Sequence, residues 1–285
     1  MRFAAAEKHY CGKKKGKYSF FHIFTSQQYS IIYYTSSNGK IVTPYDSSSF
    51  GATILSNTYK DGVGVIEFDV PITTIGDYAF YQCSSLTSVT IPDSVTTIGE
   101  AAFNECSSLT SVTIPDSVTT IGEWAFAYCS SLTSVTIPDS VTTIGEWAFY
   151  YCISLTSVTI PDSVTVIEDS TFIFCYSLTS VDIPDSVTSI GNNAFQDCRS
   201  LDSVTIPDSV TSIEWYAFAS CGSLTSVYCK ATTPPTTIVS NNGYWCAFDE
   251  NASGRKIYVP MESVEAYKSA YSWSVYASSI EGYNF

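Results

Sequence analysis

Residues 107–129 read SSLTSVTIPDSVTTIGEWAFAYC, and close copies of this segment recur along the middle of the chain. A cysteine ends each copy, so that one column of cysteines recurs every 23 residues, at Cys83, Cys106, Cys129, Cys152, Cys175, Cys198 and Cys221. A disulfide framework would not place an odd number of cysteines in one regular column. Self-similarity at a fixed period of this length is typical of solenoids, in which stacked turns share one core. We therefore predict a repeat rod with a buried, unreactive cysteine column.

The first half of a repeat has the pattern of a short strand followed by a turn. Leu109, Val112 and Ile114 carry the apolar positions, and the last two alternate with polar residues as in a strand with one buried face. The sequence Pro-Asp-Ser at 115–117 then breaks the strand. Counting strand centres from Ile66 in steps of 23 residues predicts about eight turns.

The second half of a repeat is expected to return to the core twice. Val118 and Ile121 are predicted to point inward after the turn. Ala125, Phe126 and Cys129 then follow at the spacing of a short helical turn with one buried side.

The pattern Leu-x-x-Val-x-Ile-Pro…Val-x-x-Ile-Gly…Ala-Phe-x-x-Cys covers residues 63–229 and resembles the BspA-like leucine-rich repeat of bacterial surface proteins. The resemblance implies an α/β to mainly-β fold, a right-handed solenoid of parallel short strands with short helical turns, capped at both ends. It implies roles in adhesion or ligand binding at the cell surface or after secretion. It implies no catalytic residues.

The chain outside the repeats divides into three segments. Residues 1–28 are predicted to be a disordered basic tail, because six of the 13 Lys and Arg residues lie in the first 17 positions. The apolar run at 20–24 is too short for an export signal, so none is predicted. Residues 29–62 are expected to form an N-terminal cap with a β-hairpin around Asn38-Gly39, from Ile31 to Val42.

Residues 230–285 are expected to form the C-terminal cap of the solenoid at 63–229. The prediction contains a final strand at 257–259, and a short helix at 262–271 with one apolar side. That side would carry Val264, Tyr267 and Tyr271, while Trp273, Tyr276 and Ile280 would cover the remaining apolar surface.

The repeats are strongly acidic. Residues 72–226 contain 17 Asp and Glu residues and one basic residue, Arg199, which is expected to pair with Asp197 and Asp202 at the surface. Asp116 and its equivalents form one column, and Glu123 and its equivalents form another. Ca²⁺ binding is one interpretation of the columns. The simpler interpretation is that Asp closes the turn through local backbone amides and Glu begins a helix, so no metal and no cofactor are predicted.

The outward positions of the predicted strands form columns of Ser and Thr, such as Ser111 and Thr113, which are common on an exposed sheet face. Such hydroxyl arrays can also bind ice or a repetitive polymer. Asp182, Asp202 and Tyr228 interrupt the columns in the C-terminal half. They form a second candidate ligand-binding patch.

The strongest candidate binding site is aromatic. On a helical turn that buries Phe126, residues 124 and 128 share the outer side. This pair is Trp124 and Tyr128 in one repeat and Trp147 and Tyr151 in the next, and Phe174 extends the second column. Aromatic residues of this kind anchor protein interfaces and bind sugars. The alternative interpretation is that the rings only cover one another along the rod.

The sequence therefore predicts a non-enzymatic ligand-binding or adhesion protein. The two histidines lie near the N-terminus, so the repeats lack an imidazole to activate a nucleophile. The expected partner is a protein such as a host surface or matrix protein. A neutral glycan and a structural spacer role remain alternatives. The net charge of −14 argues against nucleic acid, and no apolar run is long enough to enter a membrane.

Overall fold

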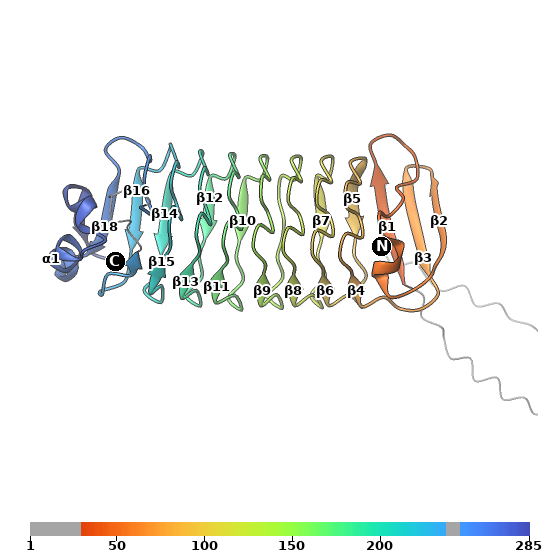
Figure 1. The fold of residues 1–285 in the computed structure, drawn as a ribbon, viewed down its shortest axis with the longest axis horizontal. Coiled ribbons are helices and arrows are strands. Elements are labelled where there is room, and N and C mark those ends of the chain that lie inside the picture. Colours follow the sequence, from red (N-terminus) through yellow and green to blue (C-terminus); the bar gives the residue numbers. More distant parts are fainter. Residues whose placement is uncertain (1–29, 238–245) are drawn as a thin grey trace, which may run out of the picture.

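The computed structural model describes residues 30–237 and 246–285, which form a long rod of about nine turns with little helix (Figure 1). Each repeat makes one turn, and equivalent strands pair in parallel with an offset of 23 residues, as in Val89 with Val112 and Val204 with Val227. The predicted repeat solenoid is thus confirmed. The proposed tail at 1–28 lies outside the described residues.

The first strands of the repeats line one side of the rod. They are β5 (Leu86–Thr90), β7 (Ser111–Thr113), β10 (Ser157–Thr159), β12 (Ser180–Asp182), β14 (Ser203–Ile206) and β16 (Ser226–Cys229). The repeat between β7 and β10 joins them through single bridges, Thr113 to Thr136 and Ser134 to Ser157. Val112 and Ile114 are buried while Ser111 and Thr113 are exposed, so the predicted alternation is confirmed.

A second row consists of two-residue strands, all of which except the first and the last follow a Pro-Asp-Ser turn. It consists of β4 (Thr74–Ile75), β6 (Thr97–Ile98), β8 (Thr120–Ile121), β9 (Thr143–Ile144), β11 (Val166–Ile167), β13 (Ser189–Ile190), β15 (Ser212–Ile213) and β17 (Thr236–Thr237). Val118 and Ile121 are both fully buried, as predicted. The serine of the Pro-Asp-Ser turn links the turns of the rod, because the hydroxyl of Ser117 donates to the carbonyl of Val95 at 2.6 Å.

The segment that carries Trp124 and Tyr128 is a series of turns, so the predicted helical turn is wrong. Both residues have left-handed backbone angles, with φ of 56° and 58°, and their equivalents in other repeats do too. The amide of Trp124 donates to the Glu146 carbonyl at 3.0 Å, and that of Tyr128 to the Tyr150 carbonyl at 2.7 Å. The amide of Ala127 donates within the turn to the Trp124 carbonyl at 2.9 Å. Alternate amides thus bond to the next turn, which a helix would not allow.

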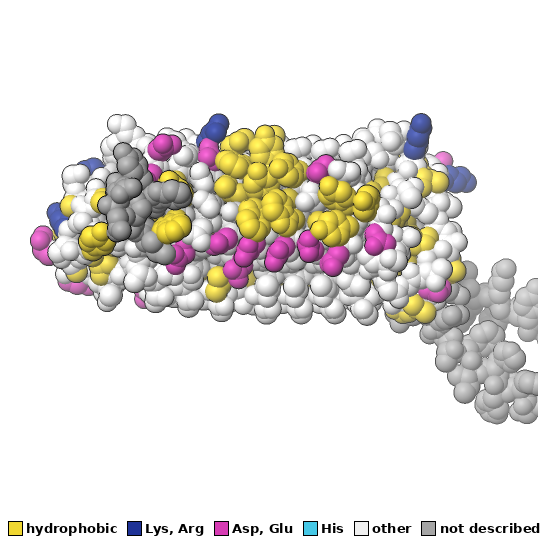
Figure 2. Space-filling model, viewed as in Figure 1, with side chains coloured by type: hydrophobic (Ala, Val, Ile, Leu, Met, Phe, Trp, Pro, Cys, Tyr) yellow, Lys and Arg dark blue, Asp and Glu magenta, His cyan; other side chains and the backbone are white. Residues whose placement is uncertain are grey.

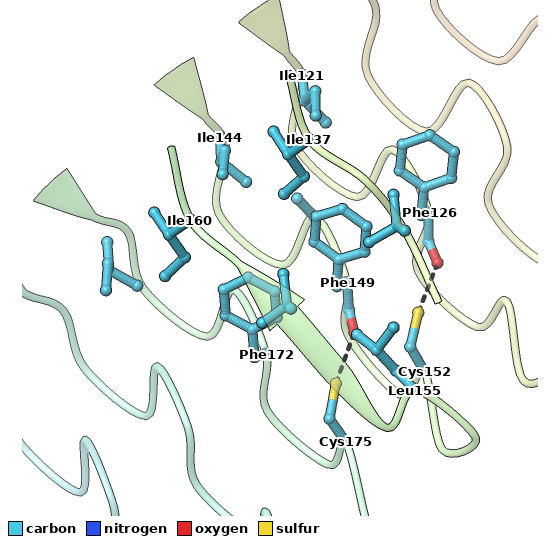
Figure 3. Packing of buried hydrophobic residues seen from close by; sticks show 14 of the residues in the cluster. Ile121, Phe126, Ile137, Ile144, Phe149, Cys152, Leu155, Ile160, Phe172 and Cys175 are labelled. Carbon is cyan, nitrogen blue, oxygen red and sulfur yellow. Dashed lines mark hydrogen bonds between the residues drawn. The ribbon is translucent and has the colours of Figure 1, made fainter. Parts of the chain in front are cut away.

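Among the buried columns of the core, those of phenylalanine and cysteine run along the rod next to each other (Figure 3). Equivalent phenylalanines stack at 5.1–5.5 Å between ring centroids and within 9° of parallel, through Phe80, Phe103, Phe126, Phe149, Phe172, Phe195, Phe218 and Phe248. Beside them the thiols from Cys106 to Cys221 each donate to a phenylalanine carbonyl, as Cys152 does to Phe126 at 3.2 Å, whereas Cys83 donates to the Thr43 carbonyl. The cysteine column is buried and unpaired by disulfides, as predicted, and burial raises the pKa of the thiols.

The N-terminal end differs from its prediction. The strand β1 (Ile31–Ser36) pairs antiparallel with both β3 (Val63–Phe68) and β5, and no strand forms at 41–42. The hairpin consists instead of β2 (Ile54–Lys60) and β3, joined by Asp61-Gly62 with both φ positive. The strand around Ile66 is therefore not a parallel turn of the solenoid, and the hairpin crosses the expected boundary at 62. A short 3-10 helix, η1 (Ser47–Phe50), lies beside β4.

The C-terminal end is closer to its prediction. The strand β18 (Lys256–Pro260) pairs in parallel with β16, and β19 (Ile280–Tyr283) adds one strand beyond the predicted last one. Between them lie η2 (Met261–Ser263), α1 (Val264–Ser269) and η3 (Ser274–Ser279). Tyr267, Trp273, Tyr276 and Ile280 are buried, whereas Tyr271 is 75% exposed and does not join the apolar side.

Glycine substitutions at two neighbouring alanines test the left-handed turn positions. Both alanines are buried, but only Ala101 has a positive φ, of 50°. Each change to glycine deletes one buried methyl group and increases the conformational entropy of the unfolded chain. We expect Ala102→Gly to lower the free energy of unfolding by about 1–2 kcal/mol. Ala101→Gly should be about neutral, because relief of the left-handed penalty offsets the loss. Equal destabilisation in urea titrations would contradict this assignment.

Thiol alkylation tests the cysteine column. Burial raises the pKa of Cys83 to about 11 and that of Cys175 to about 12, and Cys83 is the less buried of the two. Because the thiolate is the nucleophile, iodoacetamide at pH 8 should modify Cys83 first among the column cysteines and spare Cys175. Mass spectrometry measures the order, and urea-unfolded protein, in which both react, is the control. Equal rates in the folded protein would exclude the buried column.

Candidate functional site

A continuous patch of aromatic side chains covers part of the turn side of the rod. This aromatic surface consists of Trp124, Tyr128, Trp147, Tyr150, Tyr151, Phe174 and Tyr176. Figure 2 shows a large hydrophobic patch in the middle of the visible face, with a row of acidic side chains along one edge. Tyr128 is 38% exposed, and the other six rings are half-buried.

The rings of the aromatic surface contact one another in a continuous series that extends over successive repeats. Trp124 and Trp147 stack at 4.9 Å and 13°, and Tyr150 lies 5.5 Å from Trp124 and 4.9 Å from Tyr128. Tyr151 continues the chain to the last two rings, at 6.2 Å from Phe174 and 5.8 Å from Tyr176. Each such pair adds stability beyond the area that it buries. The patch is therefore one ordered surface rather than a set of separate rings.

The backbone under the aromatic surface does not favour large side chains. Trp124, Trp147, Tyr128, Tyr151 and Phe174 all have φ between 52° and 62°. Left-handed angles are cheapest for glycine and asparagine and are costly for bulky residues. Five aromatic residues thus occupy positions at which a smaller residue would cost less backbone conformational energy.

The structure brings together all five residues of the predicted aromatic site and adds two that the sequence did not indicate. Tyr150 was missed because it lies in neither of the two columns, those of Trp124 and Tyr128, that the predicted helical turn placed on the outer side. Tyr176 was missed because it follows the cysteine in a column that holds serine in earlier repeats. The predicted sharing of one outer side by residues 124 and 128 holds, although a left-handed turn and not a helix produces it.

A single arginine lies at one end of the aromatic surface. Arg199 forms an ion pair with Asp197, in which its Nη2 and Nε donate to the same carboxylate oxygen at 2.8 and 2.9 Å. Its guanidinium carbon lies 4.4 Å from the centre of the Tyr176 ring. The expected pairing with Asp202 does not form, since that carboxylate accepts from Ser203 instead.

An acidic row borders the aromatic surface. It consists of Asp77, Glu100, Glu123, Glu146 and Asp169, one from each successive repeat. It does not begin helices as predicted. Two of its members bond to the next turn, because Asp77 accepts the backbone amide of Glu100 at 2.8 Å and Asp169 that of Asn192 at 2.7 Å. Burial raises the pKa of Glu146, and the carboxylates of Asp169, Glu123 and Glu168 raise it further.

The other acidic column, of Asp93, Asp116, Asp139, Asp162, Asp185 and Asp208, is exposed. The expected bonds from local backbone amides to these carboxylates do not occur in the described residues. The turn is closed instead by the amide of Val118, which donates to the Pro115 carbonyl at 3.0 Å, and by the serine hydroxyls. Within residues 30–237 and 246–285, no group of three or more His, Cys, Asp or Glu side chains is placed to hold a metal ion.

The residues of the second candidate patch have different neighbours. Asp182 lines a groove of about 560 Å³ on the strand side, which neither Asp202 nor Tyr228 reaches. Tyr228 stacks on Tyr258 at 4.9 Å and lies 5.4 Å from Tyr283. Tyr228 therefore belongs to a tyrosine cluster that the repeat pattern could not indicate, because Tyr258 and Tyr283 lie on strands outside the repeats.

Two further threonine columns, one beside the predicted Ser111 column and one just before the second row of strands, have partners in the preceding turn. The hydroxyl of Thr110 donates to the Thr87 carbonyl at 3.0 Å, and that of Thr119 to the Thr96 carbonyl at 3.3 Å. These columns link successive turns. Across the described part of the chain, no helix is both long and apolar enough to cross a lipid bilayer.

Comparison with known protein families identifies the repeat. The family profile described as the BspA type leucine rich repeat region matches residues 52–176 and 165–280, in six copies. Among curated proteins there is no match.

Three solved structures illustrate the likeness to bacterial leucine-rich repeat proteins. A leucine-rich repeat protein of T. pallidum is 30% identical over 53% of this chain and 77% of its own, with a TM-score of 0.41. A leucine-rich cell surface protein of Faecalibacterium prausnitzii is 27% identical over 81% and 87%, with a TM-score of 0.43. A protein of Bacteroides ovatus is 26% identical over 71% and 61%, with a TM-score of 0.39.

The raised pKa of Glu146 predicts a pH-dependent gain on neutralisation. The folded protein holds the proton of Glu146 more tightly than the unfolded chain, so ionisation of this group destabilises the fold above its folded pKa. Glu146→Gln should therefore raise the melting temperature at pH 7. The gain should disappear below about pH 4.3, where the group is protonated in both states. The exposed Asp116→Asn is the control, and a gain for Glu146→Gln that does not depend on pH would contradict the explanation.

Proposed function

Because the chain belongs to the family of BspA-type leucine-rich repeat proteins, we propose that it is a non-enzymatic scaffold that binds a protein partner through the aromatic surface. Leucine-rich repeat folds are usually non-enzymatic, and the family consists of repeat scaffolds. A repeat scaffold can keep its core constant and vary its outer side chains, so a ligand site is expected where the repeats differ most.

The observation that carries the proposal is the placement of large rings at left-handed backbone positions. In other repeats the same position as Trp147 holds Ser170 or Asn193, which are smaller and leave the backbone unchanged, with φ of 56° in both. Fold stability alone would favour such residues. Rings at these positions therefore lower the stability of the fold. A half-exposed cluster of Trp and Tyr is the usual anchor of a protein interface.

The charge around the aromatic surface favours a basic partner. The acidic row lies along the patch, and the chain has a net charge of −14. An acidic rim attracts a partner with complementary charge and repels acidic ones. Apolar or aromatic side chains of the partner would contact the rings, and its basic side chains would face the acidic row.

The ring geometry favours a protein over a neutral glycan. Sugars bind by laying a ring against an open aromatic face. Trp124 and Trp147 each cover one face of the other, and Tyr128 is met by Tyr150 edge to face, at 73°. The spacer role, in contrast, would need no exposed rings, and it does not account for the 38% exposure of Tyr128.

The proposal predicts that binding depends on the indole pair. Trp124→Asn with Trp147→Asn removes both rings and inserts the residue that Asn193 already provides at an equivalent left-handed position. The fold should be retained, because the backbone angle suits asparagine. Loss of an interface anchor of this kind typically costs 2 kcal/mol or more, so affinity should fall at least about thirtyfold.

The measurement is surface plasmon resonance against purified extracellular matrix proteins and mucin, with circular dichroism as the folding check. Tyr271→Asn, which removes a 75% exposed ring outside the aromatic surface, is the matched control. Equal binding by the wild type and the double variant would refute the proposed site. Binding to mucin alone, with loss on deglycosylation, would favour the glycan alternative.

A further inference from the structure

A groove of about 580 Å³ opens beside the aromatic surface and runs along the rod over several turns. Its lining comes from two adjacent columns of the repeat, and we call it the serine groove. The lining residues are Gln82, Glu105, Tyr128 and Tyr151 from one column and Ser84, Ser107 and Ser130 from the other.

The groove exists because its second column begins with small side chains. Ser84, Ser107 and Ser130 occupy that column in three successive repeats. In the following repeats the equivalent positions hold Ile153, Tyr176 and then Arg199. This column of positions, which we call the track, is therefore open where it holds serine. It is filled by the protein's own larger side chains in the later repeats.

The filled end shows which chemistry this track accommodates. The guanidinium of Arg199 lies 4.4 Å from the centre of the Tyr176 ring, and its Nε and Nη2 both donate to one carboxylate oxygen of Asp197. An arginine held between a ring and a carboxylate combines a cation–π contact with charge-assisted hydrogen bonds. Lysine cannot make this planar contact.

The open end contains a carboxylate and rings but no cation. Glu105 occupies the repeat position of Asp197 and is half-buried. Its carboxylate accepts from the Gln82 side chain at 3.1 Å and from the Tyr81 hydroxyl at 3.5 Å. Among the described residues the ion pairs are Arg199 with Asp197 and Lys256 with Glu281, so Glu105 has none. Tyr128 lines the same groove and is exposed.

We propose that the serine groove binds an arginine side chain of the protein partner, with its guanidinium between the Glu105 carboxylate and the Tyr128 ring. This inference rests on the proposed function and specifies its partner as a peptide segment that carries arginine. The repeats themselves do not supply the cation at this groove, because residues 72–226 contain no basic residue other than Arg199. An adjacent apolar side chain of the same segment would contact the rings of the aromatic surface.

The probe is a phage-displayed library of random 12-residue peptides, selected on the full chain. Selected peptides should be enriched in arginine over lysine, and replacing that arginine by lysine in a synthetic copy should weaken binding about tenfold. Glu105→Gln should weaken the same peptide by a similar factor, whereas Asp116→Asn, which removes an exposed carboxylate elsewhere in the repeats, should not.

A second variant places the arginine in the protein itself. Ser107→Arg copies the arrangement in which Arg199 follows Asp197 by two residues, because Ser107 follows Glu105 at the same spacing. The new side chain should fill the groove and abolish peptide binding. Because Arg199 already occupies an equivalent position, the variant should fold and keep the melting temperature of the wild type.

The outcomes separate this inference from the proposed function. The arginine site would be overturned if the peptides require Trp147 but show no preference for arginine. It would also be overturned if they bind Glu105→Gln and Ser107→Arg unchanged. Either result would leave the aromatic surface as the binding site. A library that yields no peptide dependent on Trp147 would overturn both. Arginine-dependent binding lost in Glu105→Gln and Ser107→Arg, with both variants folded, is the result expected.

Discussion

Hydrogen bonds between successive turns are the interaction on which the rest of the structure depends. They join strand to strand, turn amide to turn carbonyl, serine hydroxyl to valine carbonyl and cysteine thiol to phenylalanine carbonyl. One turn of 23 residues cannot satisfy its own backbone groups or bury its own side chains. Each turn must therefore present donors and acceptors at the positions that its neighbour requires, so all repeats adopt one backbone path.

This constraint separates inward from outward positions. Phe126, Cys129 and their equivalents recur almost unchanged, because a different volume in one turn would disturb the stack of rings on both sides. The left-handed angles also recur in every repeat, whether the residue is Trp124, Ser170 or Asn193. Outward side chains at these positions are free to vary, so a chain that is uniform in backbone can carry a local aromatic surface.

The electrostatics of the rod follow from the same regularity. A carboxylate recurs in five successive turns along the acidic row, and burial together with the like charge of neighbouring carboxylates raises the pKa of Glu146. Two members of the row offset this cost by accepting backbone amides of the next turn. Arg199, in contrast, interrupts the acidic pattern and fills the track that is open near Glu105. Charge and shape thus vary together along one side of the rod.

The sequence by itself determined the repeat period, the strand positions of Val112 and Ile114, and the buried columns of phenylalanine and cysteine, because these depend on spacing that recurs in every turn. It also indicated five of the rings, from Trp124 to Phe174. Only the tertiary structure decided the non-repeated parts. The pairing of β1 with β3 and β5, and the cluster that brings Tyr150 and Tyr176 to the other rings, join residues whose contacts have no equivalent in another repeat. Periodicity predicts what each turn shares with its neighbours, and it carries no information on contacts that occur once.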